Sequence, residues 1–424
     1  MLEKYNSLDV YQDNRCNNLR KLALILTSLL PLILLFSRAI ADITLVIVGF
    51  LFVSHCIKSK NYAFLRKPIF ITPLLLWAWF MFGSLFAFES ALTAFSVSFV
   101  FTRYLLFFFA CTNWIFTEAK ALRFAVKVIT LTTLIAASDA LFQFFTGASI
   151  TGRTWPDGRL TSFLRRPDIG IYLAKLIFPL TAFILWQSNR TKTTLSAYAI
   201  LSFIIAIIML TGERTATALS LASIIAILFI IGVTNKKLIK YVISGIAGLF
   251  GFFLLLLYKS PFIYKRASDF IKDIGNFSDS LYGQLFKGSI LSWQEYGFFT
   301  GVGLRQFREA CPTFIESGQI TYCDLHSHNI YLEILSESGI IGLALFVSFV
   351  ALCLYQIFKS SLYLYNKDTK AFVSSVFLLG GLITILFPFS VTMSFITNWP
   401  GILNWVGISL CISISQVMRK NDQH

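Results

Sequence analysis

Long apolar runs alternate with short polar segments along most of the chain. Each run is close to the roughly 20 residues that an α-helix needs to cross the hydrocarbon core of a bilayer. Because backbone groups find no water there, runs of this length predict helices rather than open sheets. We therefore predict an all-α polytopic membrane protein, with residues 1–424 forming a single integral membrane domain. It would have about twelve spans, at residues 22–37, 39–57, 69–88, 91–116, 124–147, 169–187, 196–212, 215–234, 241–258, 329–358, 371–395 and 401–417.

The composition agrees with this pattern and narrows the class of protein. Of the 424 residues, 56% are hydrophobic and 13% are charged, which is about half the charged fraction of a soluble domain. The formal net charge of +15 would suit nucleic-acid binding, but Lys and Arg are spread between the apolar runs. This distribution argues against nucleic acid as a partner and is typical of a protein that follows the positive-inside rule.

The positions of the basic residues predict the orientation in the membrane. Loops on one predicted side carry several of them, including Lys58 and Lys237, whereas the turn near Phe88 on the other side carries none. By the positive-inside rule, the basic side and both termini are cytoplasmic. Residues 148–168 and 259–328 then lie on the outer face, and we expect 259–328 to form a helical lid between spans nine and ten.

The outer segment 148–168 is basic, against this rule. It carries Arg153, Arg159, Arg165 and Arg166 in a short loop. Long translocated loops escape the rule, but a short one needs another reason for so many arginines. Either the arginines bind a polyanionic ligand, or they pair with lipid phosphates or with acids of the protein itself.

Two of the four histidines lie two residues apart in "HSHNIYLEILSESGIIG", at the start of a predicted span. In a strand His326 and His328 would share a face, whereas in a helix they would lie about 200° apart, so we expect one of them to face away. Asn329 is a good helix N-cap, and Glu333 and Glu337 follow it at helical spacing. Carboxylates inside a span usually mark a site, and a carboxylate hydrogen-bonded to an imidazole would raise its basicity. The alternative is a pair of ordinary polar residues; the HExxH spacing of a zinc site is absent, and we predict no metal.

The segment "LTGERTATALS" joins two predicted spans almost without a loop. Gly212 can supply the unusual backbone angle that a very tight turn needs. Arg214 opens the next helix, where backbone N–H groups and the guanidinium fork both suit phosphate oxygens, and its neighbour Glu213 could hold it in position. The alternative is an anchor that contacts only the membrane surface.

Two further expectations concern the outer ends of the helices. Asp139, in the fifth span, is expected to contact Lys175 or the segment 148–168, and Gly301 and Gly303 are expected to mark a turn.

Cys311 and Cys323 lie twelve residues apart in the large outer segment. An oxidising outer compartment permits a disulfide between them, which would contribute about 3 kcal/mol by its effect on chain entropy. The alternative is two free thiols. The other cysteines lie singly in or beside apolar runs and are predicted to be small buried hydrophobic residues, at Cys16, Cys56, Cys111, Cys353 and Cys411.

These motifs and their layout resemble the O-antigen ligase family, which includes bacterial lipopolysaccharide ligases and related O-antigen polymerases. The resemblance is carried by the spacing His328, Asn329, nine residues, Gly339, and by the arginine of "TGERTA", Arg214. The layout of about twelve spans, with a large loop just before the histidines, is also similar. The stretch "GVGLRQFREACPTF" resembles the loop of one branch of the family.

The resemblance implies an architecture like that of GT-C glycosyltransferases in the bacterial inner membrane, with 259–328 as a large periplasmic loop. It implies an inverting transfer of a glycan from undecaprenyl diphosphate to a sugar hydroxyl of lipid A-core on the periplasmic face, without metal or cofactor. His328 would be the base or orienting group for the hydroxyl. Arg214 would hold the diphosphate.

One position departs from the pattern of the family, which usually has a second arginine in the large loop. That place falls near Gly283 or Gln284 here. Lys287, Arg266 or Arg308 could substitute, although a lysine cannot bind a phosphate through two donors in a fixed fork. We group these three with Arg159 and His326 as candidate substrate-binding residues.

Two other functions remain open. An O-antigen polymerase would use a second lipid-linked glycan as the acceptor, and the motifs do not separate it from a ligase. A transporter would need polar residues along a path through the middle of the membrane, and the predicted spans contain few.

Overall fold

The computed structural model describes residues 14–421 other than 235, 237 and 238. Helices form all of the regular structure in this part of the chain. Eleven of them are long and apolar enough to cross a membrane, or up to twelve if a bent pair counts as one span. The protein is therefore an all-α polytopic membrane protein, as the hydrophobic pattern predicts. Lys237 and both chain ends, which the orientation argument uses, lie outside the described residues.

The spanning helices follow the order of the predicted spans. They are α1 (Asn14–Phe36), α2 (Arg38–Ser59), α3 (Pro68–Gly83), α4 (Ala91–Ala110), α5 (Ala119–Thr146), α6 (Ile169–Gln187), α7 (Thr191–Leu210), α8 (Arg214–Thr234), α14 (Ile330–Tyr365), α15 (Thr369–Leu386) and α16 (Asn398–Asn421). The bent pair is α9 (Ile239–Lys259) and α10 (Pro261–Gly275). Three shorter helices follow it: α11 (Leu281–Tyr296), α12 (Phe307–Ala310) and α13 (Pro312–Glu316).

The predicted span 371–395 is wrong in its last third. α15 ends at Leu386, and residues 387–397 continue as an irregular segment before α16. Phe387 takes an extended backbone angle (ψ 125°) because the proline ring at position 388 disfavours a helical residue before it. The irregular segment 387–397 returns toward the start of α14, to which it is hydrogen-bonded.

The ninth predicted span, 241–258, is the first half of the bent pair. α9 and α10 meet at an angle of 109°. Ser260 accepts a hydrogen bond from Ile263 N–H as the N-cap of α10, and Pro261 occupies the first helical position. Both residues begin a new helix rather than continue the old one, so the chain turns at this point.

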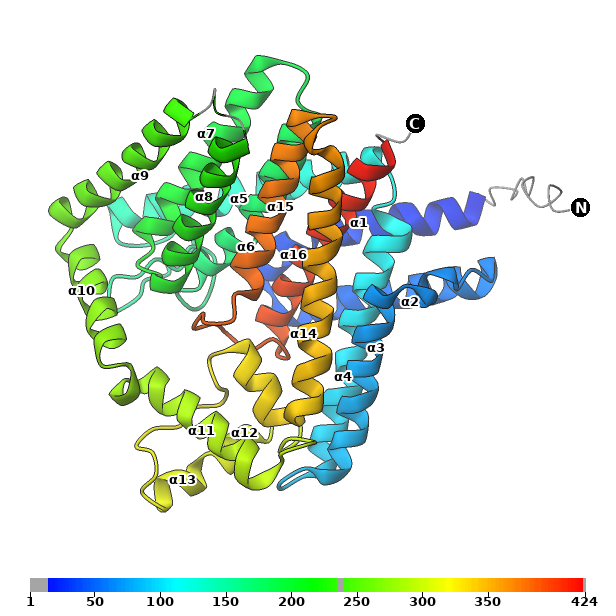
Figure 1. Cartoon of the computed structure of the whole chain (residues 1–424), viewed down its shortest axis with the longest axis vertical. Helices are drawn as coiled ribbons and strands as arrows, with labels where there is room; N and C mark the ends of the chain where they lie inside the picture. Colours follow the sequence, from blue (N-terminus) through cyan, green and yellow to red (C-terminus); the bar gives the residue numbers. More distant parts are fainter. Residues whose placement is uncertain (1–13, 235, 237–238, 422–424) are drawn as a thin grey trace, which may run out of the picture.

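The centre of the bundle is formed by α6, α15 and α16 (Figure 1). In its apolar stretch, α16 has 94% of its residues buried within the protein, so it makes almost no contact with lipid. An ion pair between Arg103 and Asp42 (3.1 Å) joins α4 to α2. Four of the single cysteines are buried, as predicted, and the side chain of Cys16 is outside what the structure describes; the four are Cys56, Cys111, Cys353 and Cys411.

Asp139 contacts the segment 148–168 rather than Lys175. Its carboxylate accepts hydrogen bonds from Ile150 N–H (2.8 Å) and Ser162 Oγ–H (2.7 Å). Lys175 instead donates to Asn404 Oδ1, which joins α6 to α16. The basic segment is therefore tied to the end of α5.

α14 is broken at Gly339, which has a φ of +68°. The turn that contains Gly301 and Gly303 packs at this break, and Val302 N–H donates to Ser336 O (2.8 Å). Both turn glycines have positive φ angles, +70° and +93°, as the expected turn requires. A Cβ at position 339 would lie 2.1 Å from a backbone carbonyl oxygen beside the turn. Only glycine fits there.

Residues 261–316, which we call the arm, curve along one end of the bundle (Figure 1). The arm consists of α10 to α13 and a short 3-10 turn, and α11 packs against α14. A disulfide joins Cys311 to Cys323, whose Cα atoms are 6.0 Å apart. It fastens the arm to the chain that leads to the histidines. We call this end of the bundle, which also holds the segment 148–168, the loop end.

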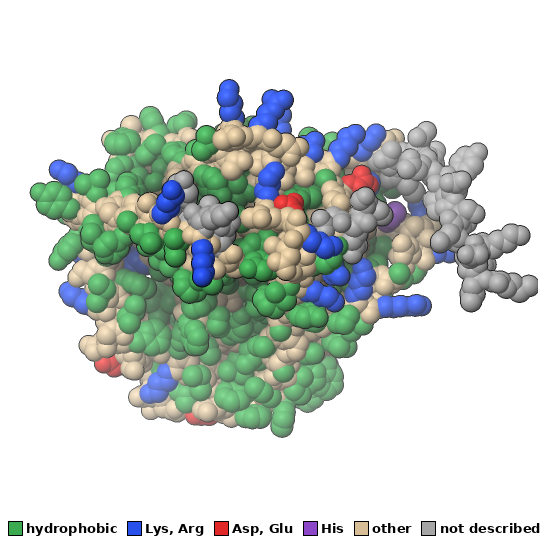
Figure 2. Space-filling model, turned by 45° about the horizontal axis from the view of Figure 1, so that its top comes forward, with side chains coloured by type: hydrophobic (Ala, Val, Ile, Leu, Met, Phe, Trp, Pro, Cys, Tyr) green, Lys and Arg blue, Asp and Glu red, His purple; other side chains and the backbone are tan. Residues whose placement is uncertain are grey.

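The opposite end of the bundle carries the short basic loops. Figure 2 shows Lys and Arg side chains protruding from this face above a largely hydrophobic flank. Exposed basic side chains of these loops include Lys58, Arg66, Lys192 and Lys367. The short basic loops thus lie together at one end of the bundle, and the orientation of this end toward the cytoplasm stays a prediction of the positive-inside rule.

Replacing Gly339 with alanine should sharply lower the unfolding temperature of the purified protein in detergent. A positive φ costs an L-residue about 1–2 kcal/mol, and the new Cβ would also meet Phe299 O at 2.1 Å. Gly318 is a matched control, since its φ is +73° and nothing lies within 4 Å of its Cβ. Gly318→Ala should show the backbone strain alone. Equal shifts for the two variants would contradict the role of packing at the break.

Candidate active site at the loop end

The start of α14 is held by the irregular segment 387–397. Thr392 N–H donates to His328 O (2.7 Å). Asn329 Nδ2 donates to two carbonyl oxygens of the segment, at 2.7 and 3.1 Å. Its Oδ1 accepts two N–H groups of the first helical turn, both at 3.0 Å. Asn329 is thus the predicted N-cap, and it also fixes the position of the histidines relative to α16.

The two histidine rings lie against each other, with centroids 4.0 Å apart. The expectation that one of them faces away is wrong, because these residues precede the helix and His328 has a left-handed φ of 52°. The His328 side chain is 24% exposed, so it is accessible from outside the protein. Tyr282 of the arm lies edge-on to it, with ring centroids 5.7 Å apart.

The carboxylate beside His328 is Asp324, which the sequence analysis did not single out. Its Oδ2 lies 3.2 Å from His328 Nε2. Glu333, one of the expected candidates, instead accepts a hydrogen bond from Phe395 N–H (2.7 Å). Glu337 is buried, and its charge interacts with that of Arg308. Both glutamates therefore support the site from within the protein.

The protonation of this group follows from its surroundings. Burial lowers the pKa of His326 to about 4, and the charge of His328 acts in the same direction. Burial acts to raise the pKa of Asp324, but Leu325 N–H and the two imidazoles outweigh it, so the pKa lies below its usual value. An ionised carboxylate can only accept a hydrogen bond, so Nε2 of His328 carries the proton and Nδ1 is the basic nitrogen.

Three arginines, Arg159, Arg214 and Arg266, gather where α8 begins. We call them the arginine group. Arg214 pairs with Asp273 of α10 (2.7 Å). The expected partner was its neighbour Glu213. Glu213 lies 3.5 Å from Arg159. The arginine of the turn is thus positioned by a helix that is distant in sequence.

Arg266 is the candidate that the fold brings to Arg214. It donates to Gly212 O (3.2 Å), and its charge interacts with those of Arg214 and Arg159. Gly212 has a φ of +74°, the unusual angle that its sequence position predicts. Lys287 does not join them, since it donates to a carbonyl of the disulfide loop (2.7 Å).

Glu213 lies at the centre of the arginine group and is largely buried. Burial and the charge of Asp168 raise its pKa to about 7, against the opposing effect of Arg159 and Arg266. The carboxyl group is therefore close to its midpoint of ionisation at neutral pH. A neutral Glu213 leaves the positive charge of the arginine group available to an anion.

Charge interactions connect the arginine group to the histidines. Arg166 acts on both His326 and Asp168, and Asp168 acts on Glu213. A small apolar crevice between α6, α8 and the segment 387–397 is lined by Thr215, which follows Arg214, and by Thr392, whose N–H binds His328. The two groups thus form one site.

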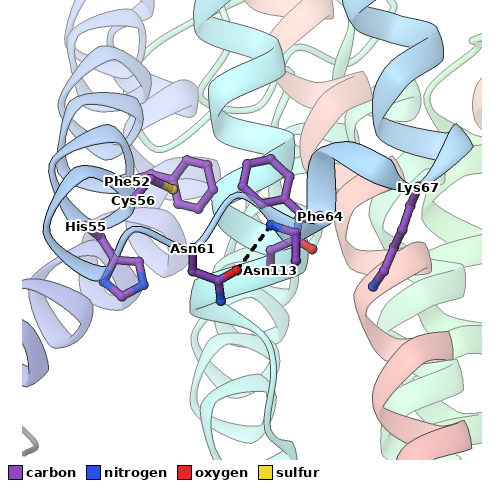
Figure 3. Close-up of a pocket in the computed structure, with 8 residues that line it drawn as sticks. Phe52, His55, Cys56, Asn61, Phe64, Lys67 and Asn113 are labelled. Atoms are coloured by element: carbon purple, nitrogen blue, oxygen red, sulfur yellow. Dashed lines mark hydrogen bonds between the residues drawn. The ribbon is translucent and has the colours of Figure 1, made fainter. Parts of the chain in front are cut away.

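A separate hollow lies at the opposite end of the bundle, between the ends of α2 and α4 and the start of α3 (Figure 3). Phe52, His55, Phe64 and Lys67 line it, and Asn61 accepts a hydrogen bond from the N–H of residue 63 (3.2 Å). It contains none of the predicted site residues and lies apart from the site.

In the part of the chain that the structure describes, no group of three or more His, Cys, Asp or Glu side chains is placed to hold a metal ion.

Comparison with known proteins identifies the part of the chain that builds this site. Residues 197–347 match the family model described as O-antigen ligase. The match includes Arg214, the arm, and the motif from His328 to Gly339. None of the curated proteins matches the chain. The match shows that residues 197–347 form a domain of the O-antigen ligase family, and the spanning helices show that the chain is a multi-pass membrane protein.

Proposed function

We propose that the protein is a glycosyltransferase, an O-antigen ligase that transfers a glycan from undecaprenyl diphosphate to a sugar hydroxyl of lipid A-core. One observation carries this proposal. A partly exposed imidazole with a carboxylate partner and a group of three arginines both lie at the loop end, connected by the charges of Arg166 and Asp168. A base beside an anion site suits the transfer of a sugar from a diphosphate. The loop end would face the periplasm, with the protein in the bacterial inner membrane.

The arginine group would bind the donor. Guanidinium groups form two parallel hydrogen bonds with phosphate oxygens, and such bonds are strong because both partners are charged. Arg214 and Arg266 lie on neighbouring elements, so they could contact both phosphates of a diphosphate. As the bond between the sugar and the diphosphate breaks, its electron pair stays on the phosphate oxygen, and the arginines would stabilise that charge.

His328 would act on the acceptor. A sugar hydroxyl attacks the anomeric carbon from the side opposite to the leaving diphosphate, which inverts the configuration. The proton of the hydroxyl would pass to Nδ1 of His328, and Asp324, bound at Nε2, would stabilise the resulting imidazolium. Every atom and charge is then accounted for by the two substrates and this chain.

His328→Asn should reduce transfer by roughly 100- to 10,000-fold, the usual contribution of a general base. Asparagine suits the experiment because it tolerates the left-handed φ of 52° and so leaves the backbone in place. His55→Ala, in the hollow at the opposite end, is the control and should retain activity. The assay would use purified protein, lipid-linked glycan and lipid A-core.

Normal transfer by His328→Asn would contradict the proposed mechanism. The same assay separates the ligase from a polymerase. Transfer to lipid A-core supports the ligase, whereas wild-type protein that elongates only lipid-linked glycan would be a polymerase.

Arg214→Lys should raise the KM for the donor and lower kcat, although the charge is kept. The variant loses at least one charge-assisted hydrogen bond worth about 1.5–3 kcal/mol, which corresponds to roughly 10- to 100-fold in kcat/KM. Arg66→Lys, an exposed residue at the opposite end, is the matched control. Wild-type kinetics in Arg214→Lys would show that its guanidinium does not bind the diphosphate.

The KM for the donor should rise as the pH is raised through about 7, the pKa of Glu213. Below this pH the carboxyl group is neutral, and above it the new negative charge repels the diphosphate and pairs with Arg159. Glu213→Gln stays neutral, so its KM for the donor should be almost independent of pH between about 6 and 8. An identical pH profile in both proteins would exclude Glu213 as the cause.

A further inference from the structure

A hollow of about 470 Å³ lies at the loop end, against the segment 148–168. The end of α1, the start of α2, the basic segment and the start of α16 form its walls. Leu34, Leu35 and Phe36 line one side, where the helices leave the membrane. The hollow thus combines an apolar border with walls from the basic segment.

Three arginines, Arg38, Arg165 and Arg166, line this hollow and are exposed. None of them forms an ion pair or a side-chain hydrogen bond with any residue that the structure describes. The nearest acid that interacts with them is Asp168, which is partly buried and acts on Arg38 and Arg166 through charge alone. The positive charge of the three arginines is therefore largely uncompensated. Such a group suits a ligand with more than one negative charge.

Two tryptophans complete the lining. Trp155 is partly exposed, and Arg159 of the arginine group lies over its ring, 5.7 Å from the centroid. Trp399 is only 3% exposed, and its buried indole N–H has no hydrogen-bond acceptor among the described residues. An indole N–H is a donor only, so the missing partner is an acceptor. Flat aromatic faces with polar donors are suited to sugar rings that carry oxygen acceptors.

One wall of the hollow interacts with the histidines. Arg166, in its wall, interacts electrostatically with His326. Trp399 directly follows the segment 387–397, whose Thr392 N–H binds His328. The hollow is therefore connected to the proposed active site through Arg166 and through the segment 387–397.

We propose that this hollow binds the acceptor, and that Arg38, Arg165 and Arg166 recognise phosphate groups on the sugar part of a membrane-anchored glycolipid. The inference rests on the proposed function, because it assigns the acceptor of that same reaction. The apolar border would receive the lipid part, the tryptophans the sugar rings, and the arginines the phosphates. Bulk anionic phospholipid carries phosphate too, but it brings no sugar for Trp155 and Trp399.

The test compares wild-type protein with the double variant Arg165→Gln/Arg166→Gln. Both residues are exposed, so the variant should fold normally. The acceptors are lipid A-core with its phosphates and the same glycolipid after phosphatase treatment. In the wild type, removal of the phosphates should raise the KM for the acceptor at least tenfold. In the double variant the KM should be high for both acceptors, with the KM for the donor unchanged.

The matched control is Lys58→Gln/Arg66→Gln, which removes two exposed charges from the opposite end of the bundle. Removal of the phosphates from the acceptor should raise the KM of this variant as much as it raises that of the wild type. A double variant that still discriminates between the two acceptors as strongly as the wild type would overturn the proposal.

A direct measurement of glycolipid binding tests the acceptor hollow independently of the transfer reaction. Native mass spectrometry should show phosphorylated lipid A-core bound to the wild type and lost from Arg165→Gln/Arg166→Gln, whether or not transfer occurs. Absence of transfer with binding retained would refute the proposed function and leave the hollow as a glycolipid site. Equal competition by phosphatidylglycerol would show a general site for anionic lipid and would overturn the assignment to the acceptor.

Discussion

The hydrogen bonds between the segment 387–397 and the start of α14 hold the loop end together. Backbone groups that leave a helix near the hydrocarbon region must find partners inside the protein. Here two irregular stretches satisfy each other, through Thr392 N–H with His328 O, the Asn329 side chain with two carbonyls, and Phe395 N–H with Glu333. His328 is consequently held at a positive φ, beside the segment 387–397. Had α15 continued through residue 388, these partners would not exist.

The two sets of arginines near His328 differ in how far acidic side chains neutralise them. Arg214 and its neighbours have acids as partners, and the proton on Glu213 decides how much of their charge is free. Arg165 and Arg166 form no ion pair with any residue that the structure describes, although the charge of Asp168 acts on Arg166. Partial neutralisation of the arginine group by acids helps the site to release its product. A diphosphate bound to three arginines without acidic partners would dissociate slowly. The uncompensated arginines suit a surface that only has to attract and orient a ligand.

The sequence was informative where a local rule decides the structure. The spans follow from apolar length, the cap at Asn329 from side-chain chemistry, and the tight turn at Gly212 from backbone freedom. Asp324 was within reach of the same reasoning, since it stands two residues before His326 in "CDLHSHN". Asp273 was not, because only the bend between α9 and α10 brings it to Arg214, 59 residues away in sequence. The adjacency of Arg166 and His326 likewise depends on how segments far apart in the chain pack.

The missing second arginine of the large loop has a structural explanation. A Cβ at Gly283 would lie 1.8 Å from Phe277 O, so no side chain fits there without moving the backbone. Gln284 is also committed, since it donates to Ser278 O (2.7 Å) and accepts from Thr321 N–H (2.9 Å). The arm therefore cannot place a cation at this point of α11. Arg266, on the preceding helix, reaches the turn beside Arg214 instead, and the bend at Ser260 is what makes that approach possible.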